Sequence, residues 1–496
     1  MKIKYYIGIA IASLAFTGCS EDFLETEPTE FVSSRQIAEY SDKNPGLRAA
    51  NMAGIYSLMF NTGTGGTDLD HDDFGQKSYD IYGDLLSADM VMGGVTYGWY
   101  TGISQMQSTI DYTDIDNYKP WRYYYRIIFS ANQVIDGYGG NDAVPESDEG
   151  KAIMGQAKAM RAYGYFYLAQ YFSEEYNPSE PILPLYTTIA IEAQPLSPTS
   201  EVYDLMISDL EDAISLLEGF NRSGKHQVNK EVAQGLLAYV YAAMGNYEEV
   251  KTVTQDVIDN GGFSIMTAEE VARAQHDGPD TDPYGGGFND VSNAGWMWGM
   301  DITLDQGLDL VSWWGQVDLY TYSYAWAGDP KLIDANLYAE IPADDVRKAQ
   351  FDGNLYPTGK FYAPARAIGG QRNIETDYLY MRVAEMYLLH AEAAAKTGDE
   401  AEARETLKML LEKRLDDVSF IDDLSGEALE DEIYLQTRIE LWGEGKSYLA
   451  MKRNMATITR GPNHLSQAGE SIPYNDDRLT FEIPLNELQN NPLITE

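Results

Sequence analysis

Aromatic and hydrogen-bonding side chains are concentrated between residues 284 and 326, which hold five of the chain's eight tryptophans. A sugar ring presents a face of C–H groups, which an aromatic plane can cover, and an edge of hydroxyls that needs polar partners. This segment supplies both kinds of side chain, so its chemistry suits the recognition of a sugar. Its rings are Tyr284, Phe288, Trp296, Trp298, Trp313, Trp314, Tyr320, Tyr322, Tyr324 and Trp326, and its polar members are Asn289, Asp290, Asn293, Asp305, Gln306 and Gln316.

Only some of these rings can be exposed. Trp296 and Trp298 have the spacing of one face of a strand, and an apolar strand belongs more often to the core. Trp313 and Trp314 are adjacent, so their side chains diverge and at least one is expected to leave any single core face. An exposed pair and a core pair both remain open.

A second aromatic group follows a glycine pair early in the chain. Tyr97 and Trp99 come shortly after Asp89 and the Gly93-Gly94 pair. Glycines around bulky rings indicate a loop that presents them, although packing of these rings into the core is the competing interpretation.

Catalytic chemistry finds little support. The five histidines are scattered, and with 78 acidic residues some pair will meet the spacing of a glycosidase by chance. The acidic stretch at 68–75 resembles the start of a calcium loop, but it lacks the glycine at the sixth place and has Tyr79 where the final glutamate belongs. No catalytic residue, metal site or cofactor is predicted.

The N-terminus has the features of a secretory signal that ends at the chain's only cysteine. Lys2 and Lys4 precede a stretch of 12 mainly apolar residues, too short for a bilayer that needs ~20. The sequence FTGC at 16–19 resembles the lipobox of bacterial lipoproteins, and SEDF after it is similar to the export tag of Bacteroidota lipoproteins. The resemblance implies a lipidated Cys19 on the outer face of the outer membrane; a chance cysteine beside an ordinary cleavage site is the alternative.

Composition limits the partners. The chain has 35 Lys and Arg against 78 Asp and Glu, a formal net charge of −43. Nucleic acid is therefore not an expected partner, because binding phosphates requires the opposite sign. Processing at Cys19 would leave no cysteine for a disulfide, so we expect the fold to be stable without one.

Two segments, 233–258 and 386–411, match position by position, with Gly245 aligned on Gly398. Each predicts a helix, a Gly-Asn or Gly-Asp turn and a second helix. The pattern resembles a tetratricopeptide repeat, which implies a mainly α scaffold stacked into a right-handed superhelix. Further helices are expected over 123–135, 152–172, 430–451, and 203–217 with Ser200 as N-cap.

The ordered series of motifs resembles the SusD/RagB family of outer-membrane nutrient-uptake lipoproteins of Bacteroidota. The motifs are CSEDFL at 19–24, SANQVID at 130–136, GQAKAMRA at 155–162, Val202-Tyr203 with Asp209-Leu210, MRVAEM at 381–386, Arg438 with Glu440, Glu444-Gly445, Ile483-Pro484 and Asn491-Pro492. The sequence departs from the family pattern at Lys446, where arginine is common, and in its closing segment.

The resemblance implies the domain organisation and the role. The expected parts are a signal peptide (1–18), a lipidated tether (19–40), an N-terminal helical region with repeat units (41–260), a loop-rich aromatic insertion (261–375) and a C-terminal repeat unit with the closing region (376–496). A non-catalytic surface protein that passes an oligosaccharide to a SusC-like TonB-dependent transporter is implied. A surface glycan-cleaving enzyme, a peptide-binding member and a pure interaction scaffold are the alternatives.

Relatives of this kind contribute ligand contacts from the early loop and from the insertion together. This implies an aromatic platform of Tyr97, Trp99, Trp313 and Trp314, with Asp89, Asn289 and Gln316 as polar contacts.

Overall fold

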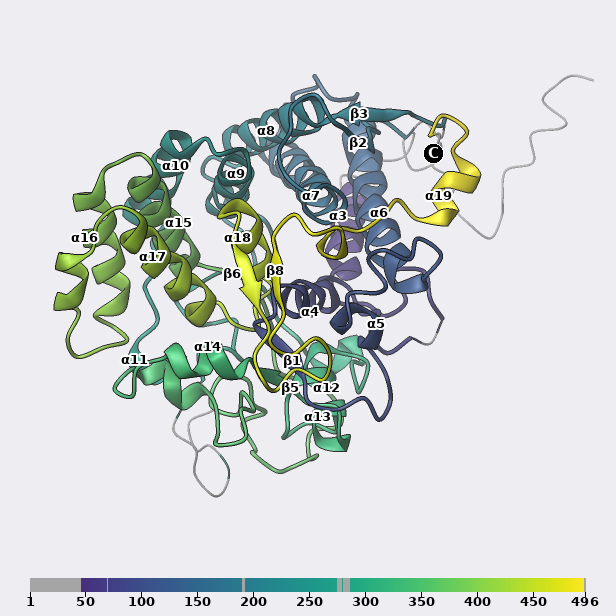
Figure 1. Cartoon of the computed structure of the whole chain (residues 1–496). Coiled ribbons are helices and arrows are strands. Elements are labelled where there is room, and N and C mark those ends of the chain that lie inside the picture. Colours follow the sequence, from purple (N-terminus) through teal and green to yellow (C-terminus); the bar gives the residue numbers. More distant parts are fainter. Residues whose placement is uncertain (1–45, 69, 190–191, 274–278, 280–285, 495–496) are drawn as a thin grey trace, which may run out of the picture. The chain divides into compact units, whose positions relative to one another are not determined.

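The computed structural model describes residues 46–68, 70–189, 192–273, 279 and 286–494 of the 496 (Figure 1). The signal sequence, Cys19 and Tyr284 lie outside these residues. From Asn51 onward the chain forms one compact unit. Within the described residues, no helix combines the length and apolar character needed to cross a bilayer.

The fold is mainly helical, as predicted. The longer helices are α3 (Gly46–Leu58), α4 (Gln76–Leu86), α6 (Ile115–Gly137), α7 (Asp148–Phe172), α8 (Thr199–Leu216), α9 (Lys230–Met244), α10 (Tyr247–Asn260), α15 (Val383–Lys396), α16 (Glu400–Leu411), α17 (Glu427–Glu440) and α18 (Ser447–Arg453). The short helices and 3-10 turns are α5 (Thr101–Ser104), α11 (Ala268–Val271), η2 (Leu304–Gln306), α12 (Trp313–Val317), α13 (Tyr324–Ala327), α14 (Ala335–Glu340), η3 (Val346–Gln350), η4 (Ser419–Asp423), η5 (Asp477–Leu479) and α19 (Leu485–Asn490).

The described strands form four antiparallel pairs. They are β1 (Met90–Met92) with β5 (Lys331–Ile333), β2 (Pro181–Pro184) with β3 (Leu196–Pro198), β4 (Trp296–Met300) with β6 (Tyr378–Arg382), and β7 (Thr457–Thr459) with β8 (Ser471–Pro473). The pairs β1–β5 and β4–β6 tie the segment 261–375 to the rest of the chain. Its boundaries as a separate domain stay a prediction.

The two predicted repeat units have the same turn geometry. Gly245 and Gly398 both adopt left-handed backbone, with φ of 74° and 84°. In each turn the glycine N–H donates to a carbonyl three residues back and the next N–H to one five residues back, which is a Schellman motif. Helices α9 and α10 therefore fold back on each other as α15 and α16 do, and α10 packs on α15 (Figure 1).

Two of the helix predictions need correction. Helix α8 begins at Thr199, with Pro198 and not Ser200 at the N-cap position. The run 430–451 is two helices, because the chain turns at Gly443 and Gly445 between α17 and α18. A Cβ at Gly445 would lie 2.5 Å from Asp80 Oδ1, so only glycine fits there.

Buried polar contacts explain several of the motifs. Arg161 on α7 donates from Nε and Nη2 to the Asp209 carboxylate of α8, both at 2.7 Å, and from Nη1 to Asn132 Oδ1 of α6 at 2.9 Å. These side chains are all buried. One arginine therefore fixes three consecutive helices of the stack.

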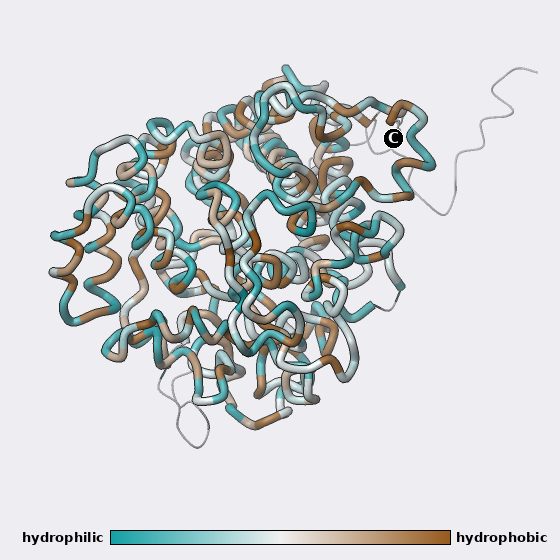
Figure 2. The backbone as a smooth tube through the Cα atoms, viewed as in Figure 1, coloured by the Kyte–Doolittle hydropathy of each residue, from teal (hydrophilic) through white to brown (hydrophobic). Residues whose placement is uncertain are grey.

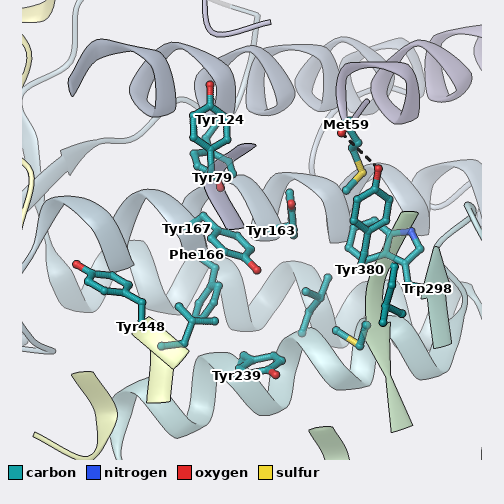
Figure 3. Packing of buried hydrophobic residues seen from close by; sticks show 14 of the residues in the cluster. Met59, Tyr79, Tyr124, Tyr163, Phe166, Tyr167, Tyr239, Trp298, Tyr380 and Tyr448 are labelled. Atoms are coloured by element: carbon teal, nitrogen blue, oxygen red, sulfur yellow. Dashed lines mark hydrogen bonds between the residues drawn. The ribbon is translucent and has the colours of Figure 1, made fainter. Parts of the chain in front are cut away.

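The core itself is rich in aromatic rings. Figure 3 shows Tyr124, Tyr167 and Phe166 among the buried side chains, and Tyr124 stacks on Tyr167 with centroids 5.3 Å apart. Trp296 and Trp298 of β4 are also buried, as their spacing favoured. Figure 2 shows hydrophobic and hydrophilic residues alternating along the outer helices. In α10 the buried residues are Val250, Thr254 and Val257, which lie on one face of the helix.

Candidate ligand-binding site

Trp313 and Trp314 lie in the core and not on an exposed platform. Their exposed fractions are 2% and 0%, because every residue of α12 is buried. The Trp313 ring packs edge-on against Phe361 at 5.3 Å, and Trp314 Nε1 donates to the Asp377 carbonyl at 3.3 Å. The prediction that one of the two rings would be exposed is wrong, since a short helix covered on all sides offers core contacts in both directions.

Four other rings form an exposed group, called the aromatic surface below. They are Tyr97, Trp99, Tyr322 and Trp326. Tyr97 is 56% and Trp326 45% exposed, while the other two are half-buried. The aromatic surface is built from the loop after β1 and from the segment around α13, which lie near each other in Figure 1.

His71 and Tyr324 connect these two segments beneath the aromatic surface. The His71 imidazole stacks on Trp99, with centroids 5.2 Å apart and planes 11° apart. Its Nδ1 lies 2.5 Å from the Tyr324 hydroxyl. The Tyr324 ring also contacts Tyr97 edge-on at 5.1 Å. These contacts fix the rings relative to one another before any ligand arrives.

Asp329 holds the backbone of the early loop. Its carboxylate accepts hydrogen bonds from the backbone N–H groups of Thr96 at 2.5 Å and Tyr97 at 2.7 Å. The loop passes so close that a Cβ at Gly94 would lie 2.0 Å from the Gly328 carbonyl oxygen. The predicted glycine-rich loop therefore needs Gly94 for close approach to its neighbour.

Asp318 plays the same part for the segment around α13. It accepts from the backbone N–H groups of Tyr320 and Ala363, both at 2.9 Å, and from the Thr321 hydroxyl at 2.7 Å. Burial raises the pKa of the Asp318 carboxyl to about 6, and these hydrogen bonds oppose the rise.

Gln316 is buried and joins the base of the site. Its Nε2 donates to the His71 carbonyl at 2.7 Å, and its Oε1 accepts from Lys331 Nζ at 2.8 Å. Burial lowers the pKa of the Lys331 ammonium to about 7. Both ends of the Gln316 amide therefore have protein partners, and the contact of Gln316 with a ligand stays a prediction.

The other polar candidates are buried as well. Asp89 is fully buried and accepts from Arg438 Nε at 3.0 Å and Nη2 at 2.5 Å. Asn289 is buried and donates from Nδ2 to the Tyr362 carbonyl at 3.2 Å. Neither side chain is exposed, and the contacts of Asp89 and Asn289 with a ligand stay predictions.

The acidic stretch at 68–75 binds a lysine. Asp70 and Asp72 lie 3.1 and 2.7 Å from Lys119 Nζ. Burial raises the pKa of the Asp72 carboxyl to about 7, with Asp116 adding to the rise and Lys119 opposing it. Among the residues that the structure describes, no group of three or more His, Cys, Asp or Glu side chains is placed to hold a metal ion.

Sequence reasoning selected Tyr97 and Trp99, whose role in binding stays a prediction, but it did not select the rings that lie beside them. Tyr322 and Trp326 stood among the aromatic residues of the insertion without being selected, and His71 was set aside as one of five scattered histidines. The signal that could have found them is the dense run YTYSYAW at 320–326. In that run Ser323 caps α13 by accepting from the Trp326 N–H at 3.0 Å, so the ring falls on a short, exposed helix.

The geometry defines a class of protein: a helical-repeat scaffold that presents a fixed, exposed aromatic surface. Two family models match the chain. One, described as the SusD family, matches residues 313–495, and the other, described as starch-binding associating with outer membrane, matches residues 86–242.

The chain is also similar to curated and solved proteins of the same group. It is 25% identical over 431 residues to SusD-like protein P38 of Formosa agariphila, covering 76% of this chain and 79% of that one. A SusD-like carbohydrate binding protein from Bacteroides vulgatus matches with a TM-score of 0.73 and 25% identity over 90% of this chain and 97% of that chain. A SusD superfamily protein from Bacteroides thetaiotaomicron matches with a TM-score of 0.71, 24% identity and coverage of 90% and 98%. The chain is therefore similar to SusD family proteins over most of its length.

Proposed function

We propose that this protein is a non-catalytic, cell-surface lipoprotein that captures an oligosaccharide on the aromatic surface. It then delivers the oligosaccharide to a SusC-like TonB-dependent transporter in the outer membrane. The observation that carries the proposal is the exposure of Tyr97 on the loop after β1 and of Trp326 on α13, two segments whose backbones Asp329 and Asp318 bind. The matching family description, starch-binding and associated with the outer membrane, supports the ligand class and the location.

The physical basis is stacking without rearrangement. An exposed ring loses water when a sugar's C–H face covers it, which contributes about 1.5–3 kcal/mol for a ring that becomes fully buried. Because the contacts of His71 and Tyr324 already order the rings, little side-chain entropy is lost on binding.

Isothermal titration against a panel of neutral and acidic oligosaccharides tests the proposal. Substitution Trp326→Ala or Tyr97→Ala should weaken binding about 10- to 100-fold, the equivalent of ~1.4–2.8 kcal/mol. The control is Phe420→Ala, which removes a ring 41% exposed on η4 and should leave the affinity unchanged.

Two outcomes would contradict the proposal. If peptides bind and no glycan does, the substrate class is wrong. If incubation with a bound glycan releases cleaved product, and neutralising one carboxylate stops the release, the protein is a glycan-cleaving enzyme.

A further inference from the structure

Arg366 is a buried cation without a carboxylate or backbone acceptor among the described residues. Its side chain is 6% exposed, and none of its three guanidinium nitrogens meets the geometry of a full hydrogen bond. Its polar side-chain neighbour is the Tyr320 hydroxyl, where Arg366 opposes the rise in pKa that burial causes. The guanidinium lies 4.0 Å from the centroid of the Tyr362 ring and 5.9 Å from that of Tyr320. A buried guanidinium presents five N–H donors, and leaving them unmet is costly. Arg366 is therefore suited to an acceptor that comes from outside the described residues.

Asp318 does not supply that acceptor. Arg366 is close enough to lower the pKa of the Asp318 carboxyl against the dominant effect of burial. The carboxylate is already engaged with the N–H groups of Tyr320 and Ala363 and with the Thr321 hydroxyl. The Coulombic interaction with Arg366 is therefore not accompanied by a hydrogen bond.

Arg372 is a second cation, placed on the aromatic surface itself. It is exposed, and its guanidinium lies 4.2 Å from the centroid of the Tyr322 ring. Tyr322 in turn lies 5.3 Å from Trp326, centroid to centroid. Within the described part of the chain, neither Arg366 nor Arg372 has a carboxylate at ion-pair distance.

One segment carries both arginines past Trp326. Gly369 lies against the Trp326 indole, where a Cβ would come within 2.9 Å of the ring. Arg366 and Arg372 are each three residues from Gly369 along the chain, which places each Cα within about 11 Å of that of Gly369. Arg372 therefore lies on the aromatic surface, and Arg366 lies on the same segment beside Tyr320 and Tyr362.

The charge of the whole chain makes this pair unusual. With a formal net charge of −43, most cations have carboxylates available, and an anionic ligand is repelled unless local positive charge receives it. Arginine binds carboxylate and sulfate oxygens through paired N–H donors, and its planar group also stacks on an aromatic ring.

We infer that the ligand of the aromatic surface is an acidic glycan, one whose sugars carry carboxylate or sulfate-ester groups, and that Arg372 and Arg366 receive those groups. This inference rests on the proposed function and specifies its substrate class. The rings stack on the C–H faces of the sugars while the guanidiniums bind the acid groups, so the two kinds of contact act on one chain of sugars.

Binding of three oligosaccharide probes to the full chain tests the inference: oligogalacturonate for carboxylate, carrageenan oligosaccharides for sulfate ester, and maltooligosaccharides as the neutral reference. At least one acidic probe should bind more tightly than the neutral one. Arg372→Gln and Arg366→Gln should each weaken that acidic probe about tenfold or more and leave the neutral probe unchanged. Arg372→Lys should recover part of the loss, and Lys413→Gln, which removes an equal charge from exposed α16-terminal surface, should have no effect.

The outcomes separate the two proposals. The acidic-glycan inference alone is overturned if the neutral probe binds most tightly and does so through Trp326. It is also overturned if an acidic probe binds and both arginine substitutions leave that binding unchanged. Binding of none of the probes, in protein with an unchanged melting temperature, overturns the proposed function and this inference with it. If Arg366→Gln fails to fold, the exposed Arg372 variants decide the question.

Discussion

At the scale of single residues, the aromatic side chains differ in how much of each ring other residues bury. Trp313 and Trp326 are only 13 positions apart, yet one is 2% and the other 45% exposed. Trp313 has Phe361 against its ring and Lys77 Nζ 4.2 Å from its centroid. Trp326 contacts the Tyr322 ring and Gly369 and still has 45% of its surface exposed. The first ring is expected to matter for stability and the second for binding.

Substitution Trp313→Ala tests this division. The change should lower the free energy of unfolding by about 3–5 kcal/mol, because it leaves a cavity where a buried indole was. Urea denaturation followed by circular dichroism measures the loss. The folded variant should keep its affinity for the glycan. Trp326→Ala is the control: it should lose affinity for the glycan while its free energy of unfolding stays nearly unchanged. If the Trp313 variant instead kept its full stability and lost binding, the Trp313 ring would contact the ligand.

The residues of the site show where sequence reasoning reaches its limit. The spacing of Tyr97 and Trp99 after a glycine pair was enough to predict a presented loop. The burial of Trp313 and Trp314 was not predictable, because it depends on contacts with Phe361 and Tyr378, which are remote in sequence. Adjacency along the chain says that two side chains diverge, but not what lies on either side.

At the scale of elements, a buried ion cluster joins β6, the turn after α16, η3 and α17. Glu440 accepts from Arg382 at 2.7 Å, from Arg414 at 2.8 Å and from Arg347 at 3.1 Å, and all four side chains are buried. Burial alone would raise the pKa of Glu440, but the three arginines outweigh it and hold the pKa well below its ordinary value.

Substitution Glu440→Gln should therefore destabilise the fold by about 3–5 kcal/mol, since it leaves three buried guanidiniums without their shared charge. Chemical denaturation measures the change. The wild type should also lose this contribution as pH falls: it is fully present above the unfolded-state pKa of about 4.3 and disappears as pH drops through the lower folded-state pKa. The control is Asp431→Asn, on the exposed face of α17. It should change neither the free energy of unfolding at pH 7 nor the way that free energy falls at acid pH. Equal stability of the Gln variant and the wild type at pH 7 would contradict the assignment.

The elements were the most predictable level of the structure. The repeat match placed α9, α10, α15 and α16, because a left-handed glycine between two helices is a local signal. The break between α17 and α18 was missed. In that turn Gly445 lies against Asp80 and Gly443 against Phe361, and no local sequence pattern records either contact.

At the scale of the whole molecule, the prediction concerns how the protein is attached to the outer membrane. Cys19 lies outside the described residues, so lipidation stays a prediction that rests on the FTGC motif. Two acyl chains anchor a protein stably, whereas one gives marginal attachment.

Expression of Cys19→Ala in a Bacteroidota host tests the anchor. The variant should lose incorporation of labelled palmitate and leave the outer-membrane fraction, because the attachment site is gone. Protease added to intact cells should degrade the wild type if it faces outward. Ser20→Ala, one position further on, should keep the label and the membrane location; a labelled Cys19 variant would place the lipid elsewhere.

The way Asp329 and Asp318 hold the loops has a consequence for evolution. Each carboxylate binds main-chain N–H groups, which every amino acid except proline carries. Mutation at position 97 therefore leaves the donor in place while replacing the ring. Point substitutions at such positions can therefore change which ligand is recognised over evolution. The hydrogen bonds that hold the backbone of the two segments stay intact.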